Sequence, residues 1–367
     1  MRFLSSALAA AIAVTLISGC SGNSTTSGAS GALLPLSNQS QPARLPAIEP
    51  FAMRATPAAA QNLYVADQAN NAVTVYSSTG TYLHAITKGV SRPNAIAFDS
   101  GQNLYVANGN NTVTVYASGK TAPFETISKG ISVPVALAIG PAGYIYVANE
   151  NGNSVTIYKG GQLVQTLFVQ APTALAFDSQ GILYIADAHT NGCDGGCYSP
   201  GFVTVCTGLP PGRTCPTVIT ARLDDPTALA VDKFDNLFVA DLTSSSVPKF
   251  LPYSQSNKYS GATYGKGQLS SPNALVFDSF GHLCASSPRN TKVYCWNSPS
   301  SIFRTLTAQN GIDNPDSLAI GPAGWLNVAN YVVSSSVTQY CPQAKGCPPR
   351  VTITQSVSGP VSIAFGP

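Results

Sequence analysis

A phrase of 16 residues recurs along this chain, and it constrains the fold more than any other feature. Its clearest copy is residues 172–187, PTALAFDSQGILYIAD, in which a polar turn joins two short apolar segments. The other copies begin at Pro93, Pro134, Pro226, Pro272 and Pro315. A chain with this much internal repetition folds by stacking equivalent supersecondary units.

Each unit is predicted to contain four β-strands, here called strands a to d. Strand a begins at the proline, and strand b is of the LYVAD type. Strand c is of the VTVY type, at 73–76, 113–116, 155–158 and 203–206. Strand d is less regular, as at 82–87, 124–128 and 163–168. β-Branched and aromatic residues fill these segments, and Gly, Asn and Ser separate them, as is typical of strands.

The spacing of the strand a prolines averages about 44 residues, which is the length of a four-stranded propeller blade. Proline suits the first position of a strand because no ladder N–H is needed there. Strand a also carries small residues at alternate positions, such as Ala174 and Ala176. Small side chains allow the innermost strands to converge around an axis.

The two ends of the repeat region predict how the ring closes. The first unit begins at strand b, residues 63–67, and the chain ends on an unpaired strand a, residues 360–365. We expect these two strands to pair, which gives an all-β, seven-bladed β-propeller of four-stranded blades with no exposed sheet edge. A six-bladed ring with one divergent unit outside it is the alternative.

The segment PNAIAFDSGQNLYVANGNNTVTVY, residues 93–116, resembles the NHL repeat, and the resemblance extends over residues 61–367. It implies a β-propeller that most often serves as a platform for a ligand or partner. The NHL pattern commonly has Arg before strand c, whereas this chain has Asn71, Thr112 and Ser154 there. Any role of that Arg is therefore not carried over.

The N-terminus predicts export and a lipid anchor. Residues 1–19 contain an apolar run, 7–17, that is shorter than the roughly 20 residues of a membrane-spanning helix. The following ISGC, residues 17–20, resembles a bacterial lipobox, which makes Cys20 the lipidation site. Residues 20–60 are rich in Ser, Gly, Pro and Ala, which predicts a flexible tether. An ordinary cleaved signal peptide is the alternative.

Eight further cysteines form an even set, which in an oxidising compartment predicts disulfides. Cys206 and Cys215 flank one c–d turn, and Cys341 and Cys347 flank the equivalent turn three units later. Local pairing also joins Cys284 to Cys295 and Cys193 to Cys197. The spacing of His189, Cys193 and Cys197 also resembles that of metal ligands. The segment lacks the CxxC pairs of structural zinc sites, so we expect a disulfide and no metal.

In a propeller the b–c and d–a loops share one face, and that face usually binds. Each strand b ends in an Asp, Asn or Ser, at Asp67, Asn108, Asn149, Asp187, Asp241, Ser287 and Asn330. We expect these side chains to cap tight turns. The longest b–c loop follows Asp187, so we expect a binding face composed of Asp187, His189, Asp194, Tyr198, Asp224 and Asp225.

The composition limits the classes of function. Charged residues make up only 10% of the chain and the formal net charge is +3, without a basic run, which argues against nucleic-acid binding. We expect a monomeric binding module for an envelope protein, peptide or glycan, facing the periplasm or exterior, with membrane contact through the lipid anchor alone. No cofactor is expected, with calcium as the alternative.

A propeller hydrolase or lyase, of the gluconolactonase or virginiamycin B lyase type, is the alternative function. Acid–base chemistry of the lyase type requires a histidine on the binding face. The chain has only His84, His189 and His282. We expect His84 on an outer strand and His282 on the opposite face, which leaves His189. The sequence thus favours a binding role over catalysis.

Overall fold

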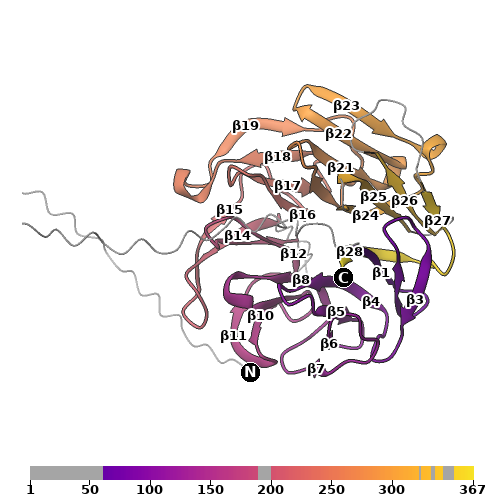
Figure 1. Ribbon diagram of the computed structural model, residues 1–367. Helices are drawn as coiled ribbons and strands as arrows, with labels where there is room; N and C mark the ends of the chain where they lie inside the picture. Colours follow the sequence, from indigo (N-terminus) through magenta and orange to yellow (C-terminus); the bar gives the residue numbers. More distant parts are fainter. Residues whose placement is uncertain (1–60, 189–199, 322–323, 332–334, 342–350) are drawn as a thin grey trace, which may run out of the picture. The chain divides into compact units, whose positions relative to one another are not determined.

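Seven antiparallel sheets of four strands each form a closed ring in the computed structural model (Figure 1). The structure describes residues 61–188, 200–321, 324–331, 335–341 and 351–367. The predicted signal peptide and tether therefore lie outside the described residues. Within the described part, no helix is long and apolar enough to cross a membrane.

The blades are numbered along the chain, and each is given from its innermost strand a to its outermost strand d. Blade 1 is β28 (Pro360–Gly366), β1 (Asn62–Asp67), β2 (Ala72–Tyr76) and β3 (Tyr82–Ile86). Blade 2 is β4 (Pro93–Phe98), β5 (Leu104–Asn108), β6 (Thr112–Tyr116) and β7 (Glu125–Ile127). Blade 3 is β8 (Pro134–Ile139), β9 (Ile145–Asn149), β10 (Ser154–Lys159) and β11 (Gln162–Phe168). Blade 4 is β12 (Pro172–Phe177), β13 (Leu183–Asp187), β14 (Phe202–Thr207) and β15 (Thr214–Ile219).

The remaining blades follow the same order. Blade 5 is β16 (Pro226–Val231), β17 (Leu237–Asp241), β18 (Val247–Phe250) and β19 (Tyr259–Tyr264). Blade 6 is β20 (Leu275–Phe277), β21 (Leu283–Ser287), β22 (Lys292–Ser298) and β23 (Ser301–Leu306). Blade 7 is β24 (Pro315–Ile320), β25 (Leu326–Asn330), β26 (Ser336–Tyr340) and β27 (Val351–Ile353). Short 3-10 turns are η1 (Pro141–Gly143), η2 (Tyr253–Gln255), η3 (Pro288–Asn290) and η4 (Ala308–Asn310).

The ring closes as the sequence predicted. The last strand, β28, pairs antiparallel with the first, β1, with Leu63 opposite Phe365 and Val65 opposite Ile363. These four side chains are buried in one apolar cluster. The side-chain amide of Asn62 also donates to the carbonyl of the last residue, at 2.8 Å. The six-bladed alternative is therefore wrong.

Adjacent blades pack through aromatic pairs of repeated geometry. An aromatic residue near the start of strand b meets the last residue of strand a in the next blade, edge to face, with ring centroids 4.8 or 4.9 Å apart. The pairs are Tyr64–Phe98, Tyr146–Phe177 and Phe238–Phe277. Edge-to-face contacts add to the stabilisation from apolar burial, so these pairs fix blade 1 to 2, blade 3 to 4 and blade 5 to 6 near the a–b turns.

Strand a of blade 6 differs from its prediction. It begins at Leu275 and not at Pro272. The cause is Ser286, which stands where the other blades have Ala. Its hydroxyl oxygen accepts the N–H of Ala274 at 2.9 Å, so a side chain replaces a contact that the strand ladder otherwise makes.

Two disulfides join the predicted partners, Cys206 with Cys215 and Cys284 with Cys295. Cys284 and Cys295 face each other directly on β21 and β22. Cys341 is disulfide-bonded as well. Its expected partner Cys347, and the pair Cys193 and Cys197, lie outside the described residues.

Removing residues 360–367 tests the ring closure. The deletion removes β28 and with it the buried side chains of Ile363 and Phe365, each worth about 2–5 kcal/mol. We expect the melting temperature in circular dichroism to fall by on the order of 10 °C or more. Deleting eight residues of the predicted tether, 40–47, is the size-matched control and should leave it unchanged. Equal melting temperatures for the two deletions would contradict this closure.

Candidate functional site

The face that carries the b–c and d–a loops is held together by one hydrogen bond repeated around the ring. The last residue of every strand b is fully buried, and its side-chain oxygen accepts a backbone N–H from the d–a loop that precedes its blade. The distances lie between 2.6 and 3.2 Å. The pairs, acceptor first, are Asp67–Ser358, Asn108–Ser91, Asn149–Ser132, Asp187–Gln170, Asp241–Asp224, Ser287–Ser270 and Asn330–Asp313.

A structural role for these side chains is therefore confirmed, although turn capping is only part of it. Asp67 and Asp241 accept an N–H within their own b–c turns, from Asn70 and Ser244. Each side chain joins the two loops that form the face, and in blade 1 the bond from Ser358 to Asp67 also spans the closure of the ring. Among the residues that the structure describes, no group of three or more His, Cys, Asp or Glu side chains could hold a metal ion. These hydrogen bonds thus fix the b–c and d–a loops to each other in every blade.

A second set of side chains links neighbouring blades on the same face. Asn71, Asn111 and Asn153 precede strand c with left-handed φ values of 51°, 62° and 44°. Their side-chain oxygens accept the N–H of the residue before the next strand a proline, at 2.7–2.9 Å. Asn tolerates this conformation better than other non-glycine residues.

This linkage corrects the sequence alignment before strand c. Thr112 and Ser154 are the first residues of β6 and β10, so Asn111 and Asn153 are the equivalents of Asn71. The residue directly before strand c is thus an Asn in blades 1, 2 and 3, and it joins two blades.

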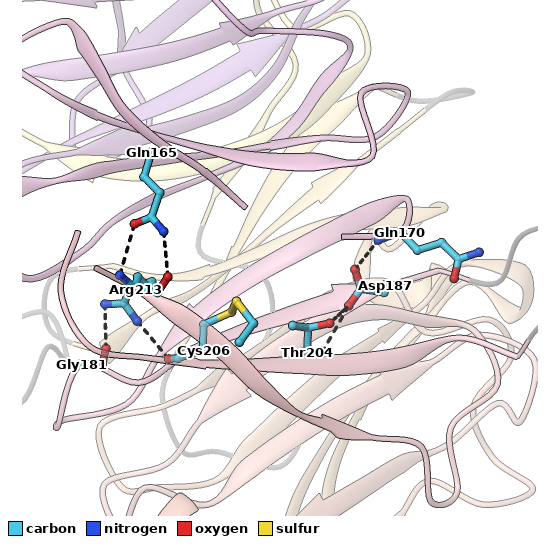
Figure 2. Close-up of a disulfide and its surroundings, with 8 residues drawn as sticks. Gln165, Gln170, Gly181, Asp187, Thr204, Cys206 and Arg213 are labelled. Carbon is cyan, nitrogen blue, oxygen red and sulfur yellow. Dashed lines mark hydrogen bonds between the residues drawn. A yellow bond between two sulfur atoms is a disulfide. The ribbon is translucent and has the colours of Figure 1, made fainter. Parts of the chain in front are cut away.

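The predicted site residue Asp187 is buried beneath the face. Its carboxylate accepts hydrogen bonds from the hydroxyl of Thr204 at 2.6 Å, from the Thr204 N–H at 3.2 Å and from the Gln170 N–H (Figure 2). Loss of hydration on burial raises the pKa of Asp187 to about 7, and these hydrogen bonds oppose the rise only in part. Asp187 therefore fixes the start of the long fourth-blade loop.

The other predicted site residues fall into two groups. Asp224 and Asp225 lie in the d–a loop before β16, where their N–H groups both donate to Asp241. The carbonyl of Asp224 accepts the N–H of Gly201, so this loop contacts the end of the fourth-blade insertion. His189, Asp194 and Tyr198 lie outside the described residues.

The two described histidines are where the sequence placed them. His84 is on the outer strand β3. His282 is in the a–b turn of blade 6, on the opposite face, with its Nδ1 2.8 Å from a carboxylate oxygen of Asp278. Neither lies on the b–c and d–a loop face.

The sequence did not lead us to predict an inner ring of polar side chains. It consists of the residues that follow the strand a prolines, and it includes Asn94, Thr173, Thr227, Asn273 and Asp316. Three of them donate to the proline carbonyl of the next blade, Asn94 to Pro134, Thr173 to Pro226 and Thr227 to Pro272, at 2.7–2.9 Å. Neighbouring strands a contact one another around the ring (Figure 1), so this position of strand a lies in the innermost layer of each blade.

Asp316 is the one ionisable residue in this inner ring. Burial raises its pKa to about 6, and the side-chain amide of Asn273, which donates to it at 2.6 Å, opposes the rise. The signal was present in the sequence, because the other residues after the strand a prolines are Asn, Thr or Val. A carboxyl group that titrates near neutral pH at the axis is a candidate contact for a bound partner.

Comparison with known proteins supports the fold. No protein-family model matches the sequence, and no curated protein matches it. The structure is similar to virginiamycin B lyase from Staphylococcus aureus, with 10% identity, a TM-score of 0.60, and coverage of 75% of this chain and 91% of that one. It is also similar to a candidate 6-phosphogluconolactonase from Bacteroides uniformis ATCC 8492, with 13% identity, a TM-score of 0.62, and coverage of 83% and 99%.

The WD40 β-propeller domain of Doa1 is a third similar structure, with 14% identity, a TM-score of 0.58, and coverage of 73% of this chain and 86% of that one. These structures share the fold with the present chain. It is a seven-bladed β-propeller protein.

The raised pKa of Asp187 predicts a pH dependence of stability. An acid with a raised folded-state pKa contributes its full stability below its unfolded pKa of 3.8 and loses it as the pH rises through about 7. The unfolding free energy of the wild-type protein should therefore fall between pH 4 and pH 7 because Asp187 ionises. In Asp187→Asn this fall should be smaller by on the order of 3 kcal/mol, because Asn does not titrate. Urea unfolding at the two pH values measures this difference.

The reverse change at the equivalent position of blade 3 is the matched control. Asn149→Asp should add a decline in stability with pH, because the new carboxylate would be buried in the same setting. Identical pH profiles for the wild-type protein and Asp187→Asn would contradict this assignment.

Proposed function

We propose that this protein is a lipid-anchored binding module of the bacterial cell envelope, related to the NHL-repeat propellers. Its b–c and d–a loop face would hold a protein, peptide or glycan partner. The observation that carries the proposal is the ring of buried strand b ends, which fixes this face from below by seven equivalent hydrogen bonds. A preorganised face loses little conformational entropy on binding.

The chemistry of the loops supports a binding role. The loops are rich in Asn, Ser and Thr, which suits adaptable hydrogen bonding to a partner. Asp316 adds one carboxyl group at the axis, where it can accept a hydrogen bond from an amine or hydroxyl of the partner. The fourth-blade insertion, which begins after Asp187, would supply the specific contacts through His189, Asp194 and Tyr198.

The proposed anchor depends on Cys20. The segment ISGC, residues 17–20, fits lipidation, and residues 20–60 would connect the lipid to the propeller. Cys20→Ser should move the protein from the membrane fraction to the soluble fraction, as measured by immunoblotting of fractionated cells. Cys193→Ser is the control and should leave the protein in the membrane fraction. Retention of the Cys20→Ser protein in membranes after alkaline washing would contradict the anchor.

Affinity purification of the lipidated protein from crosslinked cells tests the binding role. We expect one envelope component to be enriched by the wild-type protein and lost, by at least about tenfold, when residues 190–199 are replaced by a Gly/Ser segment of equal length. The same replacement in the tether, at residues 40–49, is the control and should retain the partner. Equal recovery with both variants would exclude the fourth-blade insertion as the binding segment.

A propeller hydrolase or lyase is the second candidate. Asp316 at the axis favours it, because burial raises its pKa to about 6, in the range suited to general acid–base catalysis. Hydrolysis of a lactone, with thermal stabilisation by calcium and loss of activity in Asp316→Asn, would support this alternative over the binding role.

A further inference from the structure

Exposed apolar side chains gather on the face opposite the candidate binding face, which is formed by the a–b and c–d turns. Phe234 is 68% exposed, Phe280 is 54% exposed and Leu209 is 56% exposed. Phe234 and Phe280 occupy the same place in the a–b turns of blades 5 and 6, and Leu209 lies in the c–d turn of blade 4. Among the described residues on the candidate binding face, one large apolar side chain is comparably exposed, that of Phe168 at the end of β11, at 88%.

The two phenylalanines are held on rigid turns. A carboxylate oxygen of Asp232 accepts the N–H of Phe234, and one of Asp278 accepts the N–H of Phe280, both at 2.9 Å. Blade 4 forms the same turn with Gln180 at this place, at 3.0 Å. The turn therefore does not require an aromatic residue, and folding does not account for the exposed rings.

The turn that carries Leu209 is also fixed in place. Arg213, at the end of this turn, is only 2% exposed. Its guanidinium donates to the carbonyls of Cys206 at 3.0 Å and Gly181 at 3.1 Å (Figure 2). The side chain of Gln165, on blade 3, bonds the backbone N–H and carbonyl of Arg213 at 3.3 and 2.7 Å. Together with the Cys206–Cys215 disulfide, these contacts hold the exposed leucine in one position.

Hydrogen bonds join the turns of blades 4 and 5 on this face. The contact from Arg213 to Gly181 joins the c–d turn of blade 4 to its a–b turn. Ser179 in that a–b turn donates through its N–H and its hydroxyl to Asp235, at 2.9 and 2.7 Å, which joins it to the turn that carries Phe234. Phe280 lies in the next blade. We call this surface, with Leu209, Phe234 and Phe280 as its exposed tips, the apolar turn face.

The chain enters the propeller on the same side. Asn62, the first residue of β1, pairs with Gly366 at the end of β28, which is the position of the a–b turn in blade 1. The N-terminal segment that contains Cys20 is therefore connected to the propeller on the side of the apolar turn face. A lipid at Cys20 would thus attach the propeller to a bilayer through the end of the ring that carries this face.

We propose that the apolar turn face contacts the lipid bilayer, with Phe234, Phe280 and Leu209 in the interfacial region. This inference rests on the proposed lipid anchor and adds a second, weaker membrane contact to it. Apolar side chains on a surface gain by transfer from water into the headgroup and acyl boundary. The ammonium group of Lys233 lies 5.1 Å from the Phe234 ring, where it can meet lipid phosphates. The arrangement directs the candidate binding face away from the membrane.

Tryptophan quenching in vesicles tests the inference. The lipidated protein is reconstituted into phosphatidylethanolamine–phosphatidylglycerol vesicles with brominated acyl chains, and Phe234→Trp and Phe280→Trp are compared with the wild-type protein. We expect the fluorescence added by each new tryptophan to be quenched at least about twofold, because interfacial side chains reach the acyl boundary. Asn110→Trp, in the exposed b–c loop of blade 2, is the control and should not be quenched.

Protection from trypsin is a second test, and its variant carries Gln, the residue that blade 4 has at the equivalent turn position. Trypsin cleavage after the exposed Lys233 should be slower in vesicles than in detergent by at least about fivefold, since the bilayer covers the turn. Phe234→Gln combined with Phe280→Gln should restore most of the cleavage rate and keep the melting temperature. Cleavage after the exposed Arg222, in a d–a loop, should be the same in vesicles and in detergent.

The outcomes separate this inference from the proposed anchor. A protein that floats with vesicles and shows no quenching at Phe234→Trp or Phe280→Trp overturns the membrane-facing role and leaves the anchor intact. A protein that does not float contradicts the anchor and the inference together. A blue shift at these positions that grows with protein concentration without vesicles identifies a second copy of the chain as the occupant, and overturns the inference.

Discussion

The pairing of β28 with β1 is the interaction on which the rest of the structure depends. It joins residues separated by most of the chain, and it converts a row of blades, each touching only its neighbours, into a ring without free sheet edges. The cost in chain entropy of closing so large a loop grows only with the logarithm of its length. Burial of Leu63, Val65, Ile363 and Phe365 in one cluster offsets that cost.

The seven hydrogen bonds beneath the candidate binding face follow from the same geometry. Because every strand b ends at the same height, its last side chain reaches the N–H of the neighbouring loop in each blade. The bond from Ser358 to Asp67 forms only if the ring is closed. The opposite face has a different construction, with apolar tips on turns that their own aspartates fix. One scaffold thus presents two chemically distinct surfaces.

Much of the fold could be predicted from the sequence, because the repeat marks strand starts with proline and strand b ends with Asp or Asn. The two disulfides were predictable too, since their cysteines flank equivalent turns or face each other on adjacent strands. The late start of β20 could not be predicted, because it depends on the hydroxyl of Ser286 in the neighbouring strand. Arg213 was missed since its burial depends on the gap between blades 3 and 4, where it lies over the Tyr146 ring.

The candidate site was less predictable than the fold. A single Asp after a strand a proline marks Asp316, but its raised pKa arises from burial at the axis, which the sequence does not show. Asp187 was expected on the binding face, and the structure places it beneath that face as part of the scaffold. Because capping and binding both use Asp and Asn, residue type alone does not separate them.

Native-state hydrogen exchange tests the closed ring most directly. If the pairing of β28 with β1 holds the ring together, the amides between these strands, including Tyr64 and Ala364, should exchange only by global unfolding. Their exchange free energy would then equal that of β5 and β9 in blades 2 and 3. Faster exchange confined to β28 and β1, by more than about tenfold, would show that blade 1 opens separately and would contradict the account.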